Sequence, residues 1–600
     1  MALEVREQAA ARPGSGSGID PVTFEVLKNV FDYATGRMST VLQRSSFSPI
    51  LAELVDYSNA VYDADMNCLS QAANCPVHLA AMKYSAWATA ERFGIDNLEP
   101  GDVVALNDPY NGGTHINDIT FTTPIHFEGE RLGFAVSRGH WMDLGGGSAG
   151  GQNFYGTHIA GEGLRIPPLK IYRRGELNTD LLEILIHNTR TPQYIEGDLQ
   201  AHMGALRVAE AELTQAAERY GAETVRAAMR EVIAYTERIV RTSIEKIPDG
   251  VYHAEDYADT DGYSDEPIRV KVKLVIEGSD ITVDFDGSSP QCKGAINSTL
   301  ANTTSAALYS LQFFLAPHAP ANEGMFEPIK VILPEDCWLN AKWPAPTIGS
   351  TTLASSKITS ALWQALAKAL PDQVSASTYA DCNWFVAAVT APDGSTNVIS
   401  DLPAGGWGGT PYNDGMHVTQ DPLGNCMNLQ AEAAELFYPV TYEQFDLKQD
   451  SAGAGRYRGG LGANFKARFL CEGELSMETA RTIEGTPGAN GGGRSAVQRS
   501  IKEHADGARE VLGGWTPEGE WKNPLLTGQF FRYGESFVFE STGGGGWGDP
   551  FTRPVGEVLD DVLDEYISVR AAREQYGVAI DPETFEVDRA ETARLRSRAA

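Results

Sequence analysis

Two short segments of the chain place a histidine and an aspartate three residues apart. One is His115-x-x-Asp118, within NDPYNGGTHIND, and the other is His140-x-x-Asp143, within SRGHWMD. Imidazole nitrogens and carboxylate oxygens bind divalent ions such as zinc, manganese and iron, and the neighbouring glycines would let the backbone turn closely around an ion. A metal site is therefore one interpretation. The alternative is a set of turn-stabilising polar groups, because Asn and Asp are also common in tight turns.

The stretch between the two segments predicts how they meet. Residues 119–125 and 132–139 have the composition of strands, and the sequence FEGER at 127–131 separates them as a turn would. In a β-hairpin centred near Gly129, residues whose numbers sum to about 258 face each other, so Asp118 lies opposite His140. Facing residues of an antiparallel pair have Cα atoms only about 5 Å apart. The hairpin would thus bring both segments to one end of a sheet.

Other motifs that could carry chemistry lack the context they need. Residues 146–150 spell GGSAG, which matches the GxSxG pattern of a serine nucleophile, but no helical pattern follows them. No glycine-rich phosphate-binding motif occurs, so the sequence predicts no nucleotide site in this chain. Cys75 lies close to His78 in the sequence, and its simplest interpretation is a buried thiol.

Composition and charge exclude several classes of function. Acidic residues outnumber basic ones by 80 to 48 in 600 residues, which argues against nucleic acid and against anionic membrane surfaces, since both attract clustered lysine and arginine. No stretch approaches the ~20 apolar residues that span a bilayer, and the first 18 residues lack the apolar centre of a signal peptide. The seven cysteines include no CxxC pair, which favours reduced thiols and a cytoplasmic location.

The order of helical and strand patterns predicts an α+β fold with several layers. Helical periodicity occurs at 22–45, at about 204–246 and at 555–574, and mixed or antiparallel β regions lie between these blocks. The expected parts are a flexible tail at 1–18, a metal-site domain at 19–250, an α+β middle region at 251–375, a glycine-rich β region at 376–555, and a C-terminal helical segment with a polar tail at 556–600.

Local signals set the expected boundaries of these elements. Asp20 and Pro21 are typical of a helix start, and Gly221 is expected to separate two helices in the second block. Residues 50–175 are expected to form short strands, 268–287 a hairpin, and 356–369 a helix. Glycine makes up 61 of the 600 residues, which exceeds the usual ~7%, and the glycine runs are expected in turns.

Nine segments of this sequence resemble the hydantoinase B family, in the order in which that family has them. They run from residue 20 to about 580, which is nearly the whole chain. The segments are DPVTFEVLKN (20–29), the surroundings of Asp56, CPVHLAAM (75–82), NDPYNGGTHINDITFTTPI (107–125), SRGHWMD (137–143), NTRTPQYIEGDLQA (188–201), DFDGSSPQ (284–291), GGGGWGDP (543–550) and AAREQYGV (571–578). The family includes subunits of ATP-dependent hydantoinases and of caprolactamase, part of 5-oxoprolinase, and subunits of acetone and acetophenone carboxylases.

The resemblance implies one divalent metal ion, zinc, manganese or iron, in this chain. The family's ligands fall on Asp56, His115, Asp118 and His140. Three of these are residues that the hairpin brings to one end of the sheet, and Asp56 is added by the resemblance alone. Asp143 would then lie outside the ligand set, with a role around the ligands or in orienting a ligand histidine.

Three residues near these ligands are candidates for catalytic handling of substrate or protons, namely His78, Arg138 and Asp143. The resemblance also implies a partner, a hydantoinase A-like subunit that binds ATP and Mg, in a hetero-oligomer of paired subunits. The lack of a phosphate loop here agrees with that division. The partner would activate a small substrate by phosphorylation, and the metal would polarise its carbonyl group.

The implied activity is ATP-dependent hydrolysis of a cyclic amide of the hydantoin, lactam or oxoproline type. One alternative is a subunit of an ATP-dependent ketone carboxylase of the acetone or acetophenone type, although the acetone carboxylase subunits that the chain resembles are longer. A second alternative is a non-catalytic scaffold subunit with a structural metal, because two histidines and two aspartates can also form a closed four-ligand site. All three stay open at the level of the sequence.

Overall fold

The structure is a computed structural model that describes residues 19–72, 74–264, 266–390 and 394–597. These residues form twelve α-helices and four sheets, so the predicted α+β class is confirmed. The tail expected at 1–18 lies outside the described residues. Within them, no helix is long and apolar enough to cross a membrane.

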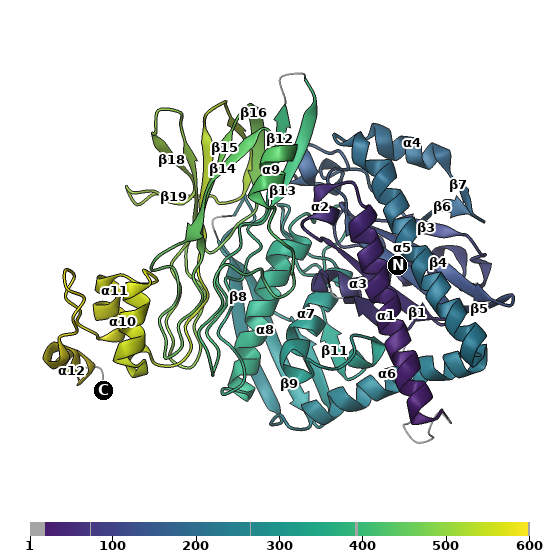
Figure 1. The fold of residues 1–600 in the computed structure, drawn as a ribbon, viewed down its shortest axis with the longest axis horizontal. Helices are drawn as coiled ribbons and strands as arrows, with labels where there is room; N and C mark the ends of the chain where they lie inside the picture. The colour runs from purple at the N-terminus through teal and green to yellow at the C-terminus, as the bar shows by residue number, and fades with distance from the viewer. Residues whose placement is uncertain (1–18, 73, 265, 391–393, 598–600) are drawn as a thin grey trace.

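A seven-stranded sheet forms the centre of the N-terminal part, in the order β2-β1-β5-β4-β3-β6-β7. The strands are β1 (Tyr57–Asp63), β2 (Cys68–Ala72), β3 (Val103–Leu106), β4 (Asp118–Phe127), β5 (Glu130–His140), β6 (Leu169–Arg173) and β7 (Glu176–Leu177). Helices cover both faces of this sheet. On one face α1 (Pro21–Ser45) packs beside α5 (Pro192–Tyr220), and on the other lies α3 (Pro76–Phe93) (Figure 1).

The β4–β5 hairpin has the predicted register at the end where the HxxD segments lie. Asp118 is the Cα partner of His140, and the same pairing continues to Ile125 and Gly133. A β-bulge after Ile125 then shifts the pairing by one residue before the turn. The bulge lies at the far end of the ladder, so it does not disturb the pairing of Asp118 with His140.

The helices follow the local signals at several points. The carboxylate of Asp20 accepts hydrogen bonds from the first turn of α1, and Gly221, with a φ of 83°, separates α5 from α6 (Ala222–Ile244). The short helices α2 (Pro49–Ala52) and α4 (Thr179–His187) complete this part. The expectation of strands throughout 50–175 was wrong, because α3 lies there. Residues 76–82 of α3 are all buried, so no polar face marks a helical period in that stretch.

A second sheet has four strands in the order β11-β10-β9-β8. Its strands are β8 (Gly250–Ala258), β9 (Ile268–Glu277), β10 (Asp280–Asp284) and β11 (Ile329–Ile332), and β9 and β10 form the predicted hairpin. Helix α7 (Leu300–Leu315) packs on α3, and α8 (Ser355–Ala369) packs on α7 and on β8 and β9. A five-residue π-helical turn, Ser350–Ala354, leads directly into α8.

Two further sheets form the C-terminal part, with the orders β13-β12-β16-β20 and β14-β15-β21-β17-β18-β19. Their strands are β12 (Phe385–Thr390), β13 (Thr396–Asp401), β14 (Val440–Leu447), β15 (Ala463–Phe469), β16 (Glu472–Met477), β17 (Arg499–Glu503), β18 (Arg509–Trp515), β19 (Trp521–Lys522), β20 (Leu526–Phe531) and β21 (Ser536–Glu540). Helix α9 (Ala431–Phe437) precedes β14.

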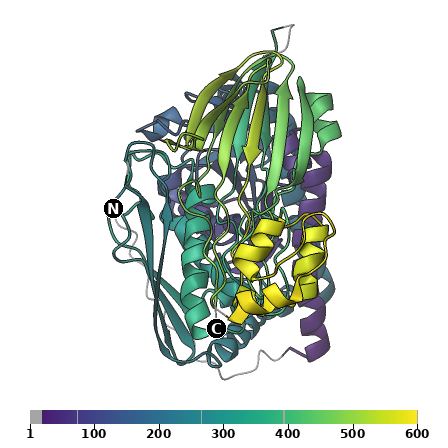
Figure 2. The same cartoon turned by 90° about the vertical axis from the view of Figure 1, so that its left-hand side faces the viewer.

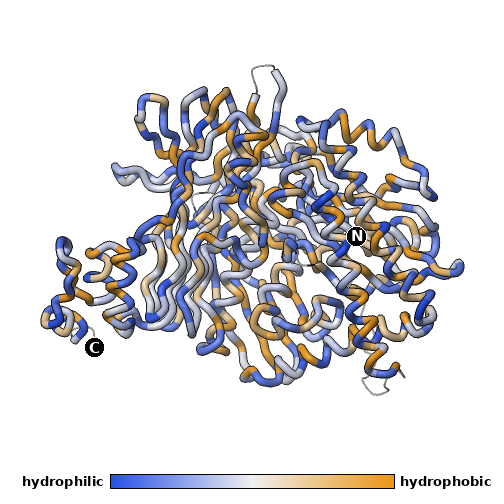
Figure 3. Tube along the Cα trace, viewed as in Figure 1, coloured by the Kyte–Doolittle hydropathy of each residue, from blue (hydrophilic) through white to orange (hydrophobic). Residues whose placement is uncertain are grey.

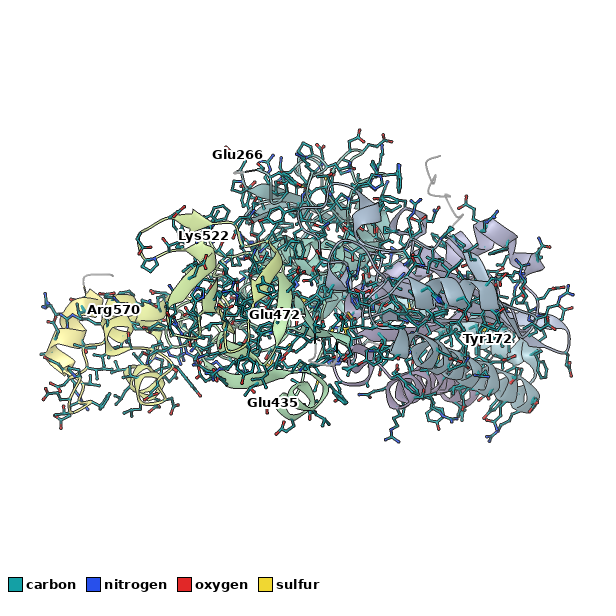
Figure 4. The ribbon with its side chains drawn as sticks, turned by 90° about the horizontal axis from the view of Figure 1, so that it is seen from above. Tyr172, Glu266, Glu435, Glu472, Lys522 and Arg570 are labelled. Carbon is teal, nitrogen blue, oxygen red and sulfur yellow. The ribbon has the colours of Figure 1, made fainter. Side chains whose placement is uncertain are left out.

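The last helices form an arm at one end of the molecule. They are α10 (Val555–Leu563), α11 (Val569–Tyr576) and α12 (Arg589–Ser597). Seen from above, Arg570 of α11 and Tyr172 of β6 mark opposite ends of the long axis (Figure 4). A polar tail was expected where α12 lies. The helix forms because Asp588 accepts a hydrogen bond from the amide of Glu591, and the Glu591 carboxylate pairs with Arg573 and Arg594.

Most of the later glycine runs lie outside turns. Between the C-terminal sheets and the arm, the extended segments 404–418, 451–462, 485–496 and 541–549 run side by side (Figures 1 and 2). We call them the glycine-rich bundle. Figure 3 shows these segments mostly pale to blue rather than orange, so few strongly hydrophobic residues lie in them. Backbone hydrogen bonds link them, such as Gly460 N to the Trp407 carbonyl (2.7 Å) and Gly544 N to the Gly460 carbonyl (3.0 Å).

The close approach of these backbones explains why the bundle needs glycine. A Cβ atom added to Gly544 would lie 2.0 Å from the carbonyl oxygen of Trp407, and one added to Gly460 would lie 1.8 Å from that of Met416. Both distances are far below van der Waals contact. The glycine excess therefore comes in part from a bundle whose backbones approach too closely to leave room for a Cβ atom at these glycines.

Candidate metal centre

Six potential ligands meet at one end of the seven-stranded sheet, and one of them is the thiol of Cys75 just before α3. Asp118 is the first residue of β4, and His140 is the last residue of β5. Asp56 precedes β1, and its carbonyl accepts a hydrogen bond from His140 N (3.0 Å), which continues the ladder by one step. His115 lies in the loop before β4, and His78 lies in the first turn of α3. Two central strands, one loop and one helix start thus converge.

The carboxylate of Asp118 lies at the centre of this group. Its oxygens are 3.2 Å from His115 Nε2, 3.3 Å from His78 Nε2 and 3.5 Å from His140 Nδ1. The carboxylate of Asp56 lies on the other side, 3.7 Å from His78 Nε2 and 3.8 Å from His140 Nδ1. All four residues implied as ligands are therefore brought together, and His78 joins them.

Burial and neighbouring charges give His115 and Asp118 the protonation states in which these side chains can bind a metal ion. Burial lowers the pKa of His115, which outweighs the opposite effect of Asp118 and leaves the imidazole neutral. Burial alone would raise the pKa of Asp118, but the imidazoles of His115 and His78 hold it well below its usual range. An ionised carboxylate beside a neutral imidazole is the form in which both side chains bind a cation.

Among the described residues, two carboxylate oxygens of the ligand cluster accept no hydrogen bond. Asp118 Oδ1 and Asp56 Oδ1 are buried atoms without a hydrogen-bond partner, and burying a carboxylate oxygen in this way is costly. The other oxygen of Asp118 accepts a hydrogen bond from the Thr114 hydroxyl. A cation between the carboxylates and the imidazoles would satisfy the unpaired oxygens. The donor set of nitrogen and oxygen atoms therefore fits a divalent metal ion.

A small cavity adjoins these ligands, with a volume of about 30 Å³. Part of its wall comes from the C-terminal half of the chain, namely Thr351, Thr352, Cys382, Trp384, Leu402, Gly424 and Cys426. The ring of Trp384 packs edge-on against His140, with 5.0 Å between ring centroids. No motif in the sequence marked any of these wall residues.

Arg138 lies behind the ligands, on the face of the sheet that α3 covers. It is fully buried. Its guanidinium donates to the hydroxyls of Thr120 and Ser85 at 2.7 Å each. Burial lowers its pKa, and the nearby Asp118 carboxylate opposes that shift. Arg138 is thus placed to compensate the charge of Asp118 from behind, and it is absent from the cavity wall. A catalytic role for Arg138 stays a prediction.

Asp143 is engaged with a loop rather than with a histidine. Its carboxylate accepts hydrogen bonds from the amides of Gly145 (2.9 Å), Gly150 (3.0 Å) and Arg190 (2.8 Å). The guanidinium of Arg190 adds a fourth at 2.9 Å, and the Thr189 hydroxyl a fifth at 3.4 Å. These contacts use both carboxylate oxygens and fix the glycine-rich loop after His140. They favour a structural role for Asp143 over the predicted role of orienting a ligand.

The chain is similar to known proteins along nearly its whole length. The model of a family described as hydantoinase B/oxoprolinase matches residues 20–550. The beta subunit of caprolactamase from Pseudomonas jessenii is 32% identical, over 94% of this chain and 97% of that protein. The B-subunit of a putative D-/L-hydantoinase from Pseudomonas sp. (strain NS671) is 30% identical, over 96% of this chain and 98% of that protein.

Two solved structures share the fold. The crystal structure of ATP-dependent caprolactamase from Pseudomonas jessenii matches with a TM-score of 0.89 and 31% identity, over 97% of this chain and 100% of the other. A nucleotide-free acetone carboxylase matches with a TM-score of 0.87 and 21% identity, over 97% of this chain and 83% of the other, and at that identity the match shows the fold alone. The resemblance of the sequence motifs is confirmed: the chain belongs to the hydantoinase B/oxoprolinase family.

Proposed function

We propose that this chain is the metal-binding subunit of an ATP-dependent hydrolase of cyclic amides. The observation that carries the proposal is the convergence of Asp56, His115, Asp118 and His140 on one point beside a cavity. Similarity over nearly the full length to one subunit of caprolactamase and to one of a putative hydantoinase supports a cyclic amide as substrate.

One divalent ion, zinc, manganese or iron, fits the donor atoms described above. When bound, such an ion supplies Lewis-acid polarisation of a carbonyl oxygen and lowers the pKa of a bound water. The protein's own contribution is positional. The β4–β5 pairing fixes Asp118 against His140, and the ring of Trp384 packs on His140 from the side.

The nucleotide is assigned to a second subunit. Both of the relatives named above are single subunits of a larger enzyme, which supports a hetero-oligomer, and the sequence contains no phosphate-binding loop. We infer that the partner is a hydantoinase A-like chain that binds ATP and Mg and phosphorylates the substrate. The seven cysteines are buried free thiols, which supports a cytoplasmic location for the complex.

A ketone carboxylase is the second candidate. The shared fold with acetone carboxylase favours it, because the same ligand cluster could hold an enolate oxygen in place of an amide carbonyl. It ranks below the hydrolase because the similarity in sequence to caprolactamase is higher, at 31% against 21%.

The test is a turnover assay on the complex of this chain with its ATP-binding partner. Lactams, hydantoins, 5-oxoproline and alkyl or aryl ketones are supplied with ATP, with and without bicarbonate, and both ADP and organic product are measured. The proposal predicts ADP formation coupled to ring opening of at least one cyclic amide. ADP formation with ketones and bicarbonate alone would replace the proposal by the carboxylase.

A further inference from the structure

Glu478 is a buried carboxyl group that the proposed reaction does not yet use. It follows β16 directly and is 1% exposed. Both of its oxygens lie within hydrogen-bond distance of one hydroxyl, that of Thr352, at 2.9 and 2.8 Å. The amide of Leu353 is its other partner. These partners are neutral groups, so neither of them compensates a negative charge on Glu478.

The surroundings of Glu478 favour its protonated form. Burial is the largest cause that raises its pKa, to about 8, and the nearby carboxylate of Asp381 adds to the rise, whereas Lys357 opposes it. Glu162 and Cys382 also interact with Glu478 electrostatically. Near neutral pH, Glu478 is therefore a carboxylic acid whose proton can be donated to an acceptor.

Thr352 connects Glu478 to the cavity beside the ligands. It lies in the π-helical turn Ser350–Ala354 and forms part of the cavity wall. Wide turns of this kind often occur at functional sites. Glu478 approaches the same wall along its backbone, since its amide donates to the carbonyl of Trp384 (3.1 Å), the residue that packs on His140.

We propose that Thr352 and Glu478 form a proton-transfer pair for the proposed ring opening beside the metal ligands. Thr352 is the residue at the reacting group, and Glu478 is a positioning residue that acts through it. The inference rests on the proposed function for the identity of the reaction. In the structure the Thr352 hydroxyl donates to the Glu478 carboxyl group. In the proposed acid form, Glu478 donates to the Thr352 oxygen instead, and the hydroxyl hydrogen of Thr352 becomes free for transfer to the substrate.

The proton transfer balances in the following way. The phosphorylated ring has a carbon–nitrogen double bond, and when water adds to its carbon one water proton goes to the nitrogen. When the carbon–nitrogen bond then breaks, its electron pair goes to the nitrogen, which takes the hydroxyl proton of Thr352, while the Thr352 oxygen takes the carboxyl proton and Glu478 becomes a carboxylate. The second proton of the water returns through Thr352 to Glu478. The phosphoryl group stays on the carboxyl end of the opened chain, and a second water releases it as phosphate. The pair thus ends the cycle in its starting state.

The kinetic test compares four variants in the complex with the partner. Glu478→Gln and Thr352→Val are expected to lower kcat about 100-fold, within the usual range for losing a general acid, while Thr352→Ser stays close to the parent. Glu162→Gln is the matched control. Glu162 is equally buried and has a similarly raised pKa, but its Oε1 is bound by the amides of Thr347 and Ile348.

The pH profile separates proton transfer from a structural effect. The parent complex should lose kcat as the pH rises through about 8, because only protonated Glu478 can donate. Glu162→Gln and Thr352→Ser should show the same decline of kcat with rising pH. Glu478→Gln should not show it, and its metal content should be unchanged. A Glu478→Gln complex that keeps both the parent kcat and its decline at high pH would overturn the proposal. An equal loss of kcat in Glu162→Gln would overturn it as well.

A second measurement does not depend on turnover. The infrared difference spectrum of the parent minus Glu478→Gln, recorded at pH 7 on the complex, should contain the C=O stretch of a carboxylic acid. Carboxylate bands in its place would overturn the proposal. A complex that shows the acid band but opens no cyclic amide would contradict the proposed function instead, so the two failures can be told apart.

Discussion

Asp118 and His140 are Cα partners at the end of the β4–β5 ladder, and His140 Nδ1 lies 3.5 Å from Asp118 Oδ1. This relationship sets the geometry of the metal centre. The pairing is fixed by backbone hydrogen bonds of two strands that lie near the middle of a buried sheet, so the two side chains meet without a flexible loop between them. His115, three residues before Asp118, lies in the loop that leads into β4, with its Nε2 3.2 Å from Asp118 Oδ1.

Replacing His140 by alanine should remove the metal and the activity together. The substitution deletes one nitrogen ligand and leaves the carboxylates of Asp56 and Asp118 without it. We expect the metal content of the purified chain to fall by at least tenfold after dialysis against a chelator, and turnover to be lost. Metal analysis and the turnover assay measure the two effects separately.

His126→Ala is the matched control for that variant. His126 lies on the same strand, β4, eight residues or about 26 Å from Asp118. It should keep both metal and activity. Loss of metal in both variants would show that the hairpin as a whole is sensitive to substitution, and it would contradict the assignment of His140 as a ligand.

Replacing Asp143 by asparagine should destabilise the chain and spare the metal. The carboxylate accepts five hydrogen bonds, one of them from the guanidinium of Arg190. Weakening a buried set that includes a charged partner costs about 2 kcal/mol, which a thermal melt would register as a lower Tm. Loss of metal at an unchanged Tm would instead support the predicted role of orienting a ligand histidine.

Replacing Gly544 by alanine should strongly destabilise the glycine-rich bundle. The new Cβ would lie 2.0 Å from the Trp407 carbonyl oxygen, and overpacking of this kind costs about 3 kcal/mol or more. Gly556→Ala is the control, since nothing lies within 4 Å of a Cβ there and the residue is in helix α10. It should leave Tm unchanged or raise it. Equal Tm values for the two variants would refute this explanation of the glycines.

Glu162 should make stability depend on pH with a definite sign. Burial raises its pKa from 4.5 to about 8 in the folded chain, so the folded state holds a proton that the unfolded state has lost between those values. The contribution of Glu162 to the free energy of unfolding is therefore greatest below pH 4.5. Between pH 4.5 and about 8 this contribution falls by about 1 kcal/mol for each pH unit. The Tm advantage of the parent over Glu162→Gln should therefore shrink from pH 5.5 to pH 8.5, and a constant difference would contradict it.

The parts of this structure that were predictable from sequence are those set by local patterns. The hairpin register follows from two strand-like stretches around a polar turn, and the pairing of Asp118 with His140 follows from that register. Helix α1 was marked by Asp20 and Pro21 at its start. Helix α3 was missed, because seven consecutive buried residues give no periodic signal.

The remainder of the site depends on packing between distant parts of the chain. Thr352 and Trp384 reach the cavity from more than 200 residues beyond His140, and no local pattern marks either of them. The π-helical turn that holds Thr352 looks like the start of an ordinary helix in the sequence. The glycine runs were assigned to turns, since the sequence does not show that four of these segments lie against one another.

The central claim is that metal held by this chain is required for ATP-dependent opening of a cyclic amide. The most direct test is to strip the metal from the purified complex with a chelator, then restore zinc, manganese or iron stepwise while ring opening is measured. We expect turnover to disappear, to return in proportion to bound metal and to saturate near one ion per chain. A complex that stays fully active without metal would contradict the claim.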